Sequence, residues 1–264
     1  MSEFLFFTGL SELTHARHFE RSFISVNTLK RRKSDFPVKA WIMDSGAFTE
    51  ISTHGHYRAS EEVYAGQIDR WRRVGDFKAA AIQDYMCEPF ILAKTGLSVA
   101  DHQRMTIERF DRLRELTDAP LLPVIQGYEP EDYVSHIEQY GNRLPNAQWV
   151  GVGSVCKRNT KPVVIEKILG LIKKKRSDLK LHGFGLKITA LRSADVRINL
   201  FSSDSMAWSF NARMNGRDSH DWREAMAYTE KVNALFTRNY DYDPNRIRDI
   251  IRAAIARQQQ LANN

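Results

Sequence analysis

Three aspartates stand at the ends of short apolar runs of the sequence. The runs AWIMD, AAAIQD and INLFSSD finish in Asp44, Asp84 and Asp204, and a fourth run, PLLPVIQG, carries Gln126 near its end. A carboxyl that follows buried apolar residues lies where water is scarce, which raises its pKa and suits it to act as an acid, a base or a nucleophile. If these side chains share one site, its chemistry is that of paired carboxylates.

The simpler alternative is that each aspartate caps the helix after it, because Asp commonly begins a helix that follows a strand. That interpretation is favoured for any single aspartate. It weakens for the three together, because the segments that follow them lack clear helix starts. Asp44 enters a Ser-Gly turn, Asp84 precedes YMCEP, and Asp204 precedes the aromatic-rich SMAWSF.

Eight short apolar runs, rich in β-branched and aromatic residues, predict the strands that position these groups. They are Phe4–Gly9, Phe23–Asn27, Ala40–Asp44, Ala79–Asp84, Pro120–Gly127, Trp149–Ser154, Leu179–Gly185 and Ile198–Asp204. Segments of helical period stand between most of them. These are Ser60–Arg73, Ser98–Leu116, Pro130–Tyr140 and Lys161–Lys175. Ser60 and Ser98 provide N-caps for the first two of these helices.

Strands that are apolar on both faces and joined by helices predict a parallel sheet of the α/β class, and eight such units close a (β/α)8 TIM-like barrel. An open doubly wound sheet is the rival, but TGLSEL after the first run is no dinucleotide fingerprint. We expect one domain over residues 1–264, with C-terminal helices at about 218–264 packed on the barrel. Because a barrel enzyme works at the carboxyl ends of its strands, the three aspartates and Gln126 should meet there.

Charge and cysteine content narrow the class of protein. The 264 residues carry a net charge of +7 with a pI near 9.4, which favours a polyanionic partner. The basic runs LKRRK (residues 29–33) and KKKR (residues 173–176) are candidates for phosphate contact, although such runs are more often solvated faces or helix ends. Two cysteines are too few for a disulfide framework or a four-thiolate zinc site. With no membrane span or signal peptide expected either, the predicted location is cytoplasmic.

Four motifs together resemble the tRNA-guanine transglycosylases. They are DSGAF beginning at Asp44, VIQG ending at Gly127, GVGSV beginning at Gly151, and FSSDSMAW around Asp204, which is followed by NGR. Their order and their places relative to the predicted strands match over roughly residues 40–217. A match of this length is more specific than any one of these short motifs.

The resemblance implies a role for each matched residue. Asp204 is the nucleophile that attacks the anomeric carbon of a nucleotide, and Asp44 is the acid and base that serves the departing and arriving bases. Asp84 accepts hydrogen bonds from the N1 and N2 edge of guanine, and Gln126 reads the O6 side. The other residues implied to contact the base are Ser45, Gly46, Phe48, Gly127, Gly151 and Gly153. Beyond the predicted strand ends, the candidates for phosphate contact are Arg158, Lys187, Arg213 and Arg217.

The chain departs from the tRNA enzymes in ways that shift the expected substrate. Ala47 stands where they carry a second Gly, Thr49 replaces a Gln, and two residues rather than one separate Asp84 from Cys87. The Cys-rich zinc motif that helps those enzymes hold tRNA has no counterpart. A small, basic chain without that motif is more similar to the DNA-acting branch of the family, DpdA, which occurs in phages and bacteria.

That branch exchanges guanine in DNA for a 7-deazaguanine, so the resemblance implies a pentosyltransferase. The implied partners are DNA, with its guanine single-stranded or flipped out, and a free base such as 7-cyano-7-deazaguanine. No cofactor and no metal are implied. Three alternatives stay open: a tRNA substrate, a DNA glycosylase that uses water as acceptor, and a barrel that binds nucleic acid without turnover. The sequence leaves the particular deazaguanine and the oligomeric state undefined.

Overall fold

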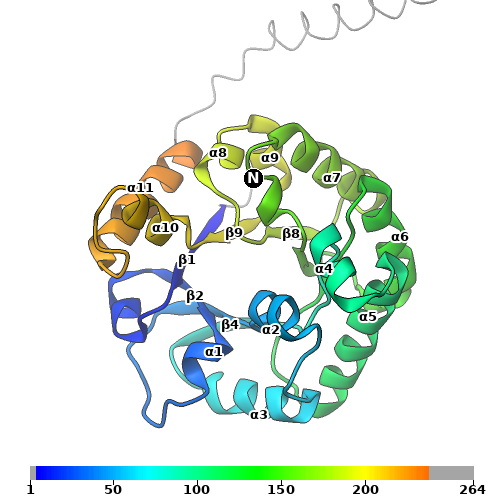
Figure 1. The fold of residues 1–264 in the computed structure, drawn as a ribbon, viewed down its shortest axis with the longest axis horizontal. Coiled ribbons are helices and arrows are strands. Elements are labelled where there is room, and N and C mark those ends of the chain that lie inside the picture. The colour runs from blue at the N-terminus through cyan, green and yellow to red at the C-terminus, as the bar shows by residue number, and fades with distance from the viewer. Residues whose placement is uncertain (1–3, 238–264) are drawn as a thin grey trace, which may run out of the picture.

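The computed structural model describes residues 4–237, whose strands form one parallel sheet rolled into a nearly closed barrel (Figure 1). Nine strands in this range hydrogen-bond in the order β5-β4-β3-β2-β1-β9-β8-β7-β6. They are β1 (Leu5–Leu10), β2 (Arg21–Ser25), β3 (Ala40–Asp44), β4 (Asp76–Ala81), β5 (Leu121–Leu122), β6 (Val124–Ile125), β7 (Trp149–Val152), β8 (Lys180–Gly183) and β9 (Ser202–Ser205). The expected α/β TIM-like barrel is confirmed.

The nine strands correspond to the eight predicted runs because the fifth run is split. Pro123 separates β5 from β6, and a proline has no N–H to donate to a neighbouring strand. β5 pairs with β4 on one side, and β6 pairs with β7 on the other. The two edges of the sheet are therefore consecutive in the sequence, so the chain itself nearly closes the ring.

Several predicted strand boundaries were wrong, and two of these errors concern runs that end in an aspartate. The run Ile198–Asp204 begins inside helix α9 (Ala194–Asn199), whose N-cap Ser193 accepts a hydrogen bond from the Val196 N–H, and the strand starts only at Ser202. β4 ends at Ala81, so Asp84 lies in the following loop rather than on the strand. The local helix cap outweighed the apolar character of the eighth run.

The four predicted helices are present and surround the sheet (Figure 1). They are α3 (Glu61–Trp71), α5 (Val99–Leu116), α6 (Pro130–Tyr140) and α7 (Pro162–Lys175). Both predicted caps are confirmed, because Ser60 accepts from the Val63 N–H and Ser98 forms a capping box with Asp101. Their apolar faces pack on the barrel and contribute to the main hydrophobic core together with the strands.

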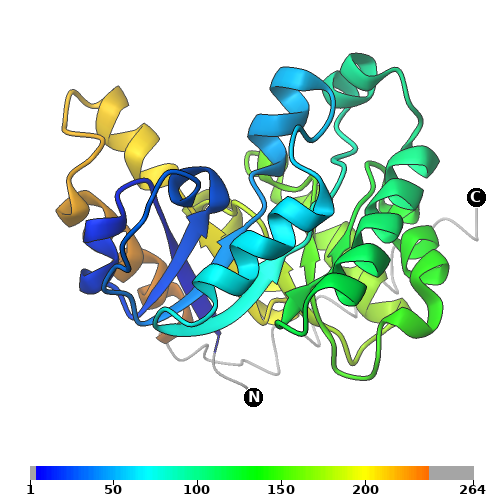
Figure 2. The same cartoon turned by 90° about the horizontal axis from the view of Figure 1, so that it is seen from below.

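Short helices occupy the loops that follow the strands. Besides α9 they are α1 (Val26–Leu29), α2 (Ala47–His54), α4 (Pro89–Thr95), α8 (Ile188–Leu191) and α10 (Ala207–Met214), together with the 3-10 turns η1 (Leu13–His18), η2 (Gly141–Arg143) and η3 (Cys156–Arg158). Helices α2 and α4 stand above the barrel mouth, the end at which the strands finish (Figure 2). A second, small hydrophobic cluster that includes Ile51 and Ile91 holds them together.

The C-terminal part of the described chain closes the ring of helices. Helix α11 (Trp222–Thr237) packs against β1, with Thr229 hydrogen-bonded to Thr8 at 2.7 Å and Phe236 stacked on Phe4. The remainder of the expected C-terminal helical segment, residues 238–264, lies outside the described residues. None of the helices between residues 4 and 237 combines the length and the hydropathy that a membrane span requires.

Candidate active site

The three aspartates lie at the barrel mouth and are close enough to influence one another. Asp44 is the last residue of β3, Asp204 is in β9, and Asp84 lies in the loop after β4. The charge of Asp204 raises the pKa of Asp44, and the charge of Asp44 raises the pKa of Asp84. The ring of strands thus gathers carboxylates that are up to 160 residues apart in the sequence (204 minus 44).

None of the three aspartates is the N-cap of the helix that follows it. Contrary to the sequence interpretation, helices do begin soon after Asp44 and Asp204, but their N-cap residues are Gly46 and Met206, and neither has a side-chain cap. Helix α4 after Asp84 begins at an N-cap glutamate, Glu88, likewise without a side-chain cap. The capping alternative is therefore excluded for all three.

Asp44 has the electrostatics of a general acid. Burial and the neighbouring Asp204 charge raise its pKa from 3.8 to about 6, against the opposing effect of hydrogen bonds such as that from the Gly46 N–H to Oδ2 at 3.0 Å. Gly46 has φ of +75°, and a Cβ there would lie 2.4 Å from the Asn27 amide nitrogen. A glycine at this position allows the turn that brings this N–H back to the carboxyl.

Asp84 is buried at 7 % exposure, and its pKa is raised to about 7. Burial is the main cause, and the charges of Asp44 and Glu88 add to it. The amide of Gln126 donates a hydrogen bond to Asp84 Oδ2, which opposes the rise. A carboxyl held by an amide in this way presents a compact acceptor and donor pair to a flat polar substrate.

A hydrogen-bond chain continues from Gln126 away from Asp84. Gln126 Oε1 and Glu88 Oε2 each lie 2.8 Å from the Ser154 hydroxyl oxygen. That oxygen also accepts a hydrogen bond from the Cys87 N–H at 2.9 Å. A hydroxyl has one proton, so it donates to only one of the two oxygens at a time. If Ser154 donates to Gln126, then Glu88 must be protonated to complete the chain, and burial does raise the pKa of Glu88.

Close packing explains the glycine that precedes Ser154. A Cβ on Gly153 would lie 2.2 Å from Gln126 Nε2, so any other residue displaces this amide. The N–H groups of Gly151 and Gly153 donate to Pro123 and Ile125 within the sheet. These two glycines therefore make room for neighbouring side chains, and their amides are already occupied.

Asp204 is oriented by two donors on one oxygen. His182 Nε2 lies 3.2 Å from Asp204 Oδ1, and the Gly185 N–H donates to the same oxygen at 3.0 Å. His182 Nδ1 in turn lies 2.9 Å from the Ser202 hydroxyl, which accepts from the Trp149 indole at 2.8 Å. Within residues 4–237 the other oxygen, Oδ2, has no hydrogen-bond partner.

His182, Glu88 and Ser154 were missed in the sequence. His182 had a visible signal, since it is a polar residue inside the apolar run LKLHGFG and is fully buried in β8. Glu88 is 3 % exposed and precedes a proline at a helix start, a place where glutamate is usual and solvated. Nothing local in the sequence distinguished it.

The remaining residues implied to contact the base are divided between mouth and core. Ser45 is buried directly after Asp44, whereas Phe48 on α2 is 44 % exposed at the rim, 6.4 Å from the Phe90 ring and under Lys157. Gly127 packs against α6, where a Cβ would meet Asp132 at 2.7 Å. Phe48 is thus free to contact a substrate, whereas Gly127 serves packing.

The four candidate phosphate contacts differ in how freely they reach solvent. Lys187 and Arg213 are exposed and flank the Phe210 ring at 5.6 and 5.5 Å from its centroid. Arg158 is half-buried, stacks on Tyr128 and donates to that residue's carbonyl. Arg217 is exposed but forms an ion pair with Glu224 at 2.6 Å.

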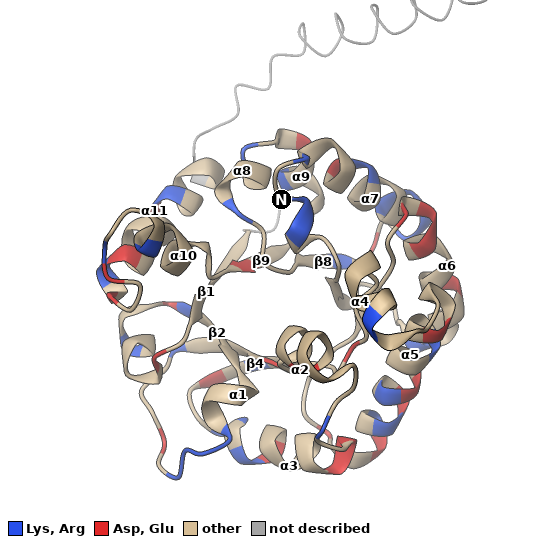
Figure 3. Cartoon of the chain, viewed as in Figure 1, with Lys and Arg blue, Asp and Glu red and all other residues tan. Residues whose placement is uncertain are grey.

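The two basic runs differ in how near they come to the three aspartates, since Lys30 lines a hollow with Ser45, the residue after Asp44. Lys173 and Lys175 end α7 at the opposite face of the barrel from the mouth, where Lys175 pairs with Glu138. In the first run, Arg32 caps backbone carbonyls and Lys30 pairs with Glu50 at 3.3 Å. Acidic and basic residues alternate around the outer helices (Figure 3). The ordinary interpretation, a solvated helix end, fits the second run, whereas Lys30 of the first run pairs with a buried glutamate beside the mouth.

The amino-acid sequence was compared with models of known protein families. The model of DpdA, DeoxyPurine in DNA protein A, matches residues 3–231. The chain belongs to the DpdA family. A search of curated proteins found no match. The match covers every residue of the site described above, from Asp44 to Asp204, and it identifies a DNA-modifying enzyme related to the tRNA-guanine transglycosylases.

For this DpdA family member, DNA is accordingly the expected substrate. Among residues 4–237, no group of three or more His, Cys, Asp or Glu side chains is arranged to hold a metal ion.

Proposed function

We propose that the protein exchanges guanine in DNA for a 7-deazaguanine base through a covalent glycosyl-aspartate. The observation that carries the proposal is the meeting of Asp44, Asp84, Gln126 and Asp204 at one barrel mouth in a DpdA family member. Two carboxyls around one anomeric carbon support a double displacement with retention of configuration. A third carboxyl with an amide supplies recognition of the base.

In the first step, Asp204 Oδ2 attacks C1′ of the target deoxyguanosine. The new C1′–O bond forms as the C1′–N9 bond breaks, and the electron pair of the broken bond leaves with guanine. Asp44 supplies the proton that the departing base needs. Its raised pKa, about 6, keeps a useful fraction of this carboxyl protonated near neutral pH.

In the second step, the exchange is completed by the incoming base. A 7-deazaguanine gives its N9 proton to the Asp44 carboxylate and attacks C1′ with the electron pair of that nitrogen, so the ester bond to Asp204 breaks. Both aspartates return to their starting protonation states. His182 and the Gly185 N–H hold Oδ1 throughout, which keeps Oδ2 directed at the sugar.

Recognition of the base falls to Asp84 and Gln126. An ionised Asp84 accepts from the N1–H and N2–H of guanine. The 7-deazaguanines present the same N1–H and N2–H edge, so one carboxylate recognises both bases. Binding of these donors favours the ionised form and so lowers the raised pKa of Asp84. The Gln126 amide nitrogen has a second hydrogen besides the one it donates to Asp84, and the O6 side is assigned to it. Phe48 at the rim is free to stack on the base.

The test is base exchange with purified protein. Single-stranded DNA that carries labelled guanine is incubated with 7-cyano-7-deazaguanine, and released guanine and modified nucleosides are measured by mass spectrometry. The proposal expects release that depends on the added base, and no release by Asp204→Asn. Release without added base, with abasic sites left in the DNA, identifies a glycosylase instead. Uptake by tRNA in preference to DNA identifies the tRNA reaction.

The proposed setting is the cytoplasm, of the host if a phage encodes the protein, where DNA and free deazaguanine bases meet. The outcome in which Asp204→Asn changes no measurable activity favours a barrel that binds nucleic acid without turnover. That outcome rejects the catalytic proposal even if the DNA is bound.

A further inference from the structure

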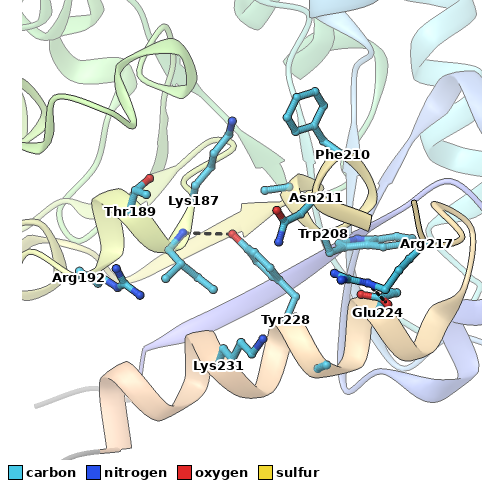
Figure 4. A pocket seen from close by; sticks show the side chains of 13 residues that line it. Lys187, Thr189, Arg192, Trp208, Phe210, Asn211, Arg217, Glu224, Tyr228 and Lys231 are labelled. Carbon is cyan, nitrogen blue, oxygen red and sulfur yellow. Dashed lines mark hydrogen bonds and ion pairs between the residues drawn. The ribbon is translucent and has the colours of Figure 1, made fainter. Parts of the chain in front are cut away.

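A cavity of about 420 Å³ lies beside the strand that carries Asp204 (Figure 4). Its walls are the start of α8, helix α10 and helix α11. Tyr228 of α11 forms part of the wall. Its hydroxyl accepts from the Ile188 N–H at 3.2 Å and lies 3.4 Å from the hydroxyl of Ser205, the residue after Asp204. This volume is within the range of ligand pockets, and the cavity adjoins the candidate active site.

The lining of the cavity is strongly basic. Four cationic side chains face one carboxylate, and that carboxylate, Glu224, is already paired with Arg217. The other three cations, Lys187, Arg192 and Lys231, are exposed and make no ion pair with any residue in the described range 4–237. Three uncompensated cations around one hollow favour an anionic occupant.

An exposed aromatic ring stands at the edge of this hollow. Phe210 is 52 % exposed on α10, with Lys187 Nζ 5.6 Å from its centroid. Figure 4 shows Phe210 and Lys187 pointing the same way, while Lys231 lies across the cavity on α11. A solvent-exposed ring surrounded by cations is the combination with which proteins hold single-stranded nucleic acid, the ring for a base and the cations for its phosphate.

We propose that this cavity binds the nucleotide next to the target guanine in the same DNA strand. Its base stacks on Phe210 beside Lys187, and its phosphate extends into the cavity toward Arg192 and Lys231. This inference rests on the proposed function, since the target guanine must reach Asp204. An acidic peptide would satisfy the cations but offers no flat ring to Phe210. A base held here has left its stack, so the preferred substrate has at least two adjacent unpaired nucleotides.

The experiment measures binding rather than turnover. Single-stranded oligonucleotides with one guanine carry 2-aminopurine on its 5′ or 3′ side, and their fluorescence and affinity are followed with the full-length protein. We expect quenching at one of the two positions on binding, because 2-aminopurine stacks on the ring. Phe210→Ala removes that quenching and weakens binding by about 5- to 140-fold, the equivalent of one stacked base.

An oligonucleotide that lacks the base next to the target guanine isolates the contact between that base and Phe210. When the same position is abasic, Phe210→Ala should no longer weaken binding. Lys231→Ala should lower the salt dependence of binding by about 0.7 in the logarithmic slope, the value for one phosphate contact on a single strand. Ile198→Ala, on exposed α9, and Lys174→Ala, on α7, are the matched controls outside the cavity and should change neither property.

Three results overturn the proposal: unchanged fluorescence at both positions with wild-type affinity for Phe210→Ala, no measurable DNA binding, or competition by polyglutamate as effective as that by an oligonucleotide of equal charge. The failure of the subsite differs from failure of the proposed function. Base exchange that is insensitive to Phe210→Ala rejects the subsite alone. Phe210-dependent quenching in a protein that exchanges no base rejects the function alone.

Discussion

The carboxyl of Asp84 allows a test of the buried site that needs no substrate. Its pKa is raised from 3.8 to about 7, chiefly by burial. A tenfold change in proton affinity corresponds to about 1.4 kcal/mol, so ionising this group in the folded protein costs up to about 4 kcal/mol more than in the unfolded chain. Replacing Asp84 with Asn removes that cost while leaving an oxygen that can accept from Gln126.

The direction of the effect depends on pH. Below about pH 4 the carboxyl is protonated in both states, so the wild-type protein suffers no penalty there. As pH rises from about 4 to about 7, the unfolded chain releases the proton while the folded protein retains it, so wild-type stability falls. Asp84→Asn lacks this fall. The variant should therefore gain up to about 4 kcal/mol in the free energy of unfolding at about pH 8, relative to its difference from wild type at about pH 4.

Denaturant unfolding of both proteins across this pH range measures the difference. Asp35→Asn is the control, because that aspartate is exposed and distant from the mouth. A stability difference between Asp84→Asn and wild type that stays constant from about pH 4 to about pH 8 would refute the reasoning that Asp84 is buried at an electrostatic cost. The same variant should exchange guanine more slowly than wild type, as expected if stability is sacrificed for recognition.

Three further predictions concern other residues of the barrel mouth. Gly153→Ala places a Cβ 2.2 Å from the Gln126 amide, so the KM for the free base should rise at least about tenfold. The melting temperature of the variant serves as the control for an intact fold. An unchanged KM would show that Gln126 takes no part in recognition of the base. His182→Gln should slow formation of the glycosyl-enzyme, measured in single turnovers, by about 10- to 100-fold while the affinity for DNA stays unchanged. An equal loss of DNA affinity would indicate that His182 has a structural role only. Guanine release in single turnovers should decline as pH rises through about 6, because Asp44 loses the proton that the leaving base needs; a rate that increases over that range contradicts its role as the acid.

Most of the fold could be predicted because its signals are local. Apolar runs and helical periods placed the strands and the four large helices, and Ser60 and Ser98 marked helix starts through caps that are visible in the sequence. Errors arose where two local signals competed. Ile198 is apolar and β-branched, yet the cap at Ser193 keeps it in a helix. Pro123 inside an apolar run was a visible sign of the break between β5 and β6.

The candidate site was predictable only in part, for a physical reason. Asp44 and Asp204 stand at strand ends, and in a parallel barrel all strand ends meet at one mouth, so topology alone brings them together. Their partners come from distant segments. The bond between His182 and Asp204 and the chain from Asp84 through Gln126 to Ser154 depend on how neighbouring loops pack, which no spacing in the sequence reports. The basic cavity beside α11 has the same origin, since three separate segments line it.

The most direct measurement of the central claim is the detection of a covalent bond between Asp204 and DNA. Protein mixed with guanine-containing single-stranded DNA, in the absence of an incoming base, is denatured in acid and digested, and its peptides are weighed by mass spectrometry. The account predicts a deoxyribose-linked peptide that contains Asp204, which is lost when 7-cyano-7-deazaguanine is added before denaturation and never forms with Asp204→Asn. A protein that exchanges the base while its Asp204 peptide stays unmodified, or an adduct located on Asp44 instead, would contradict it.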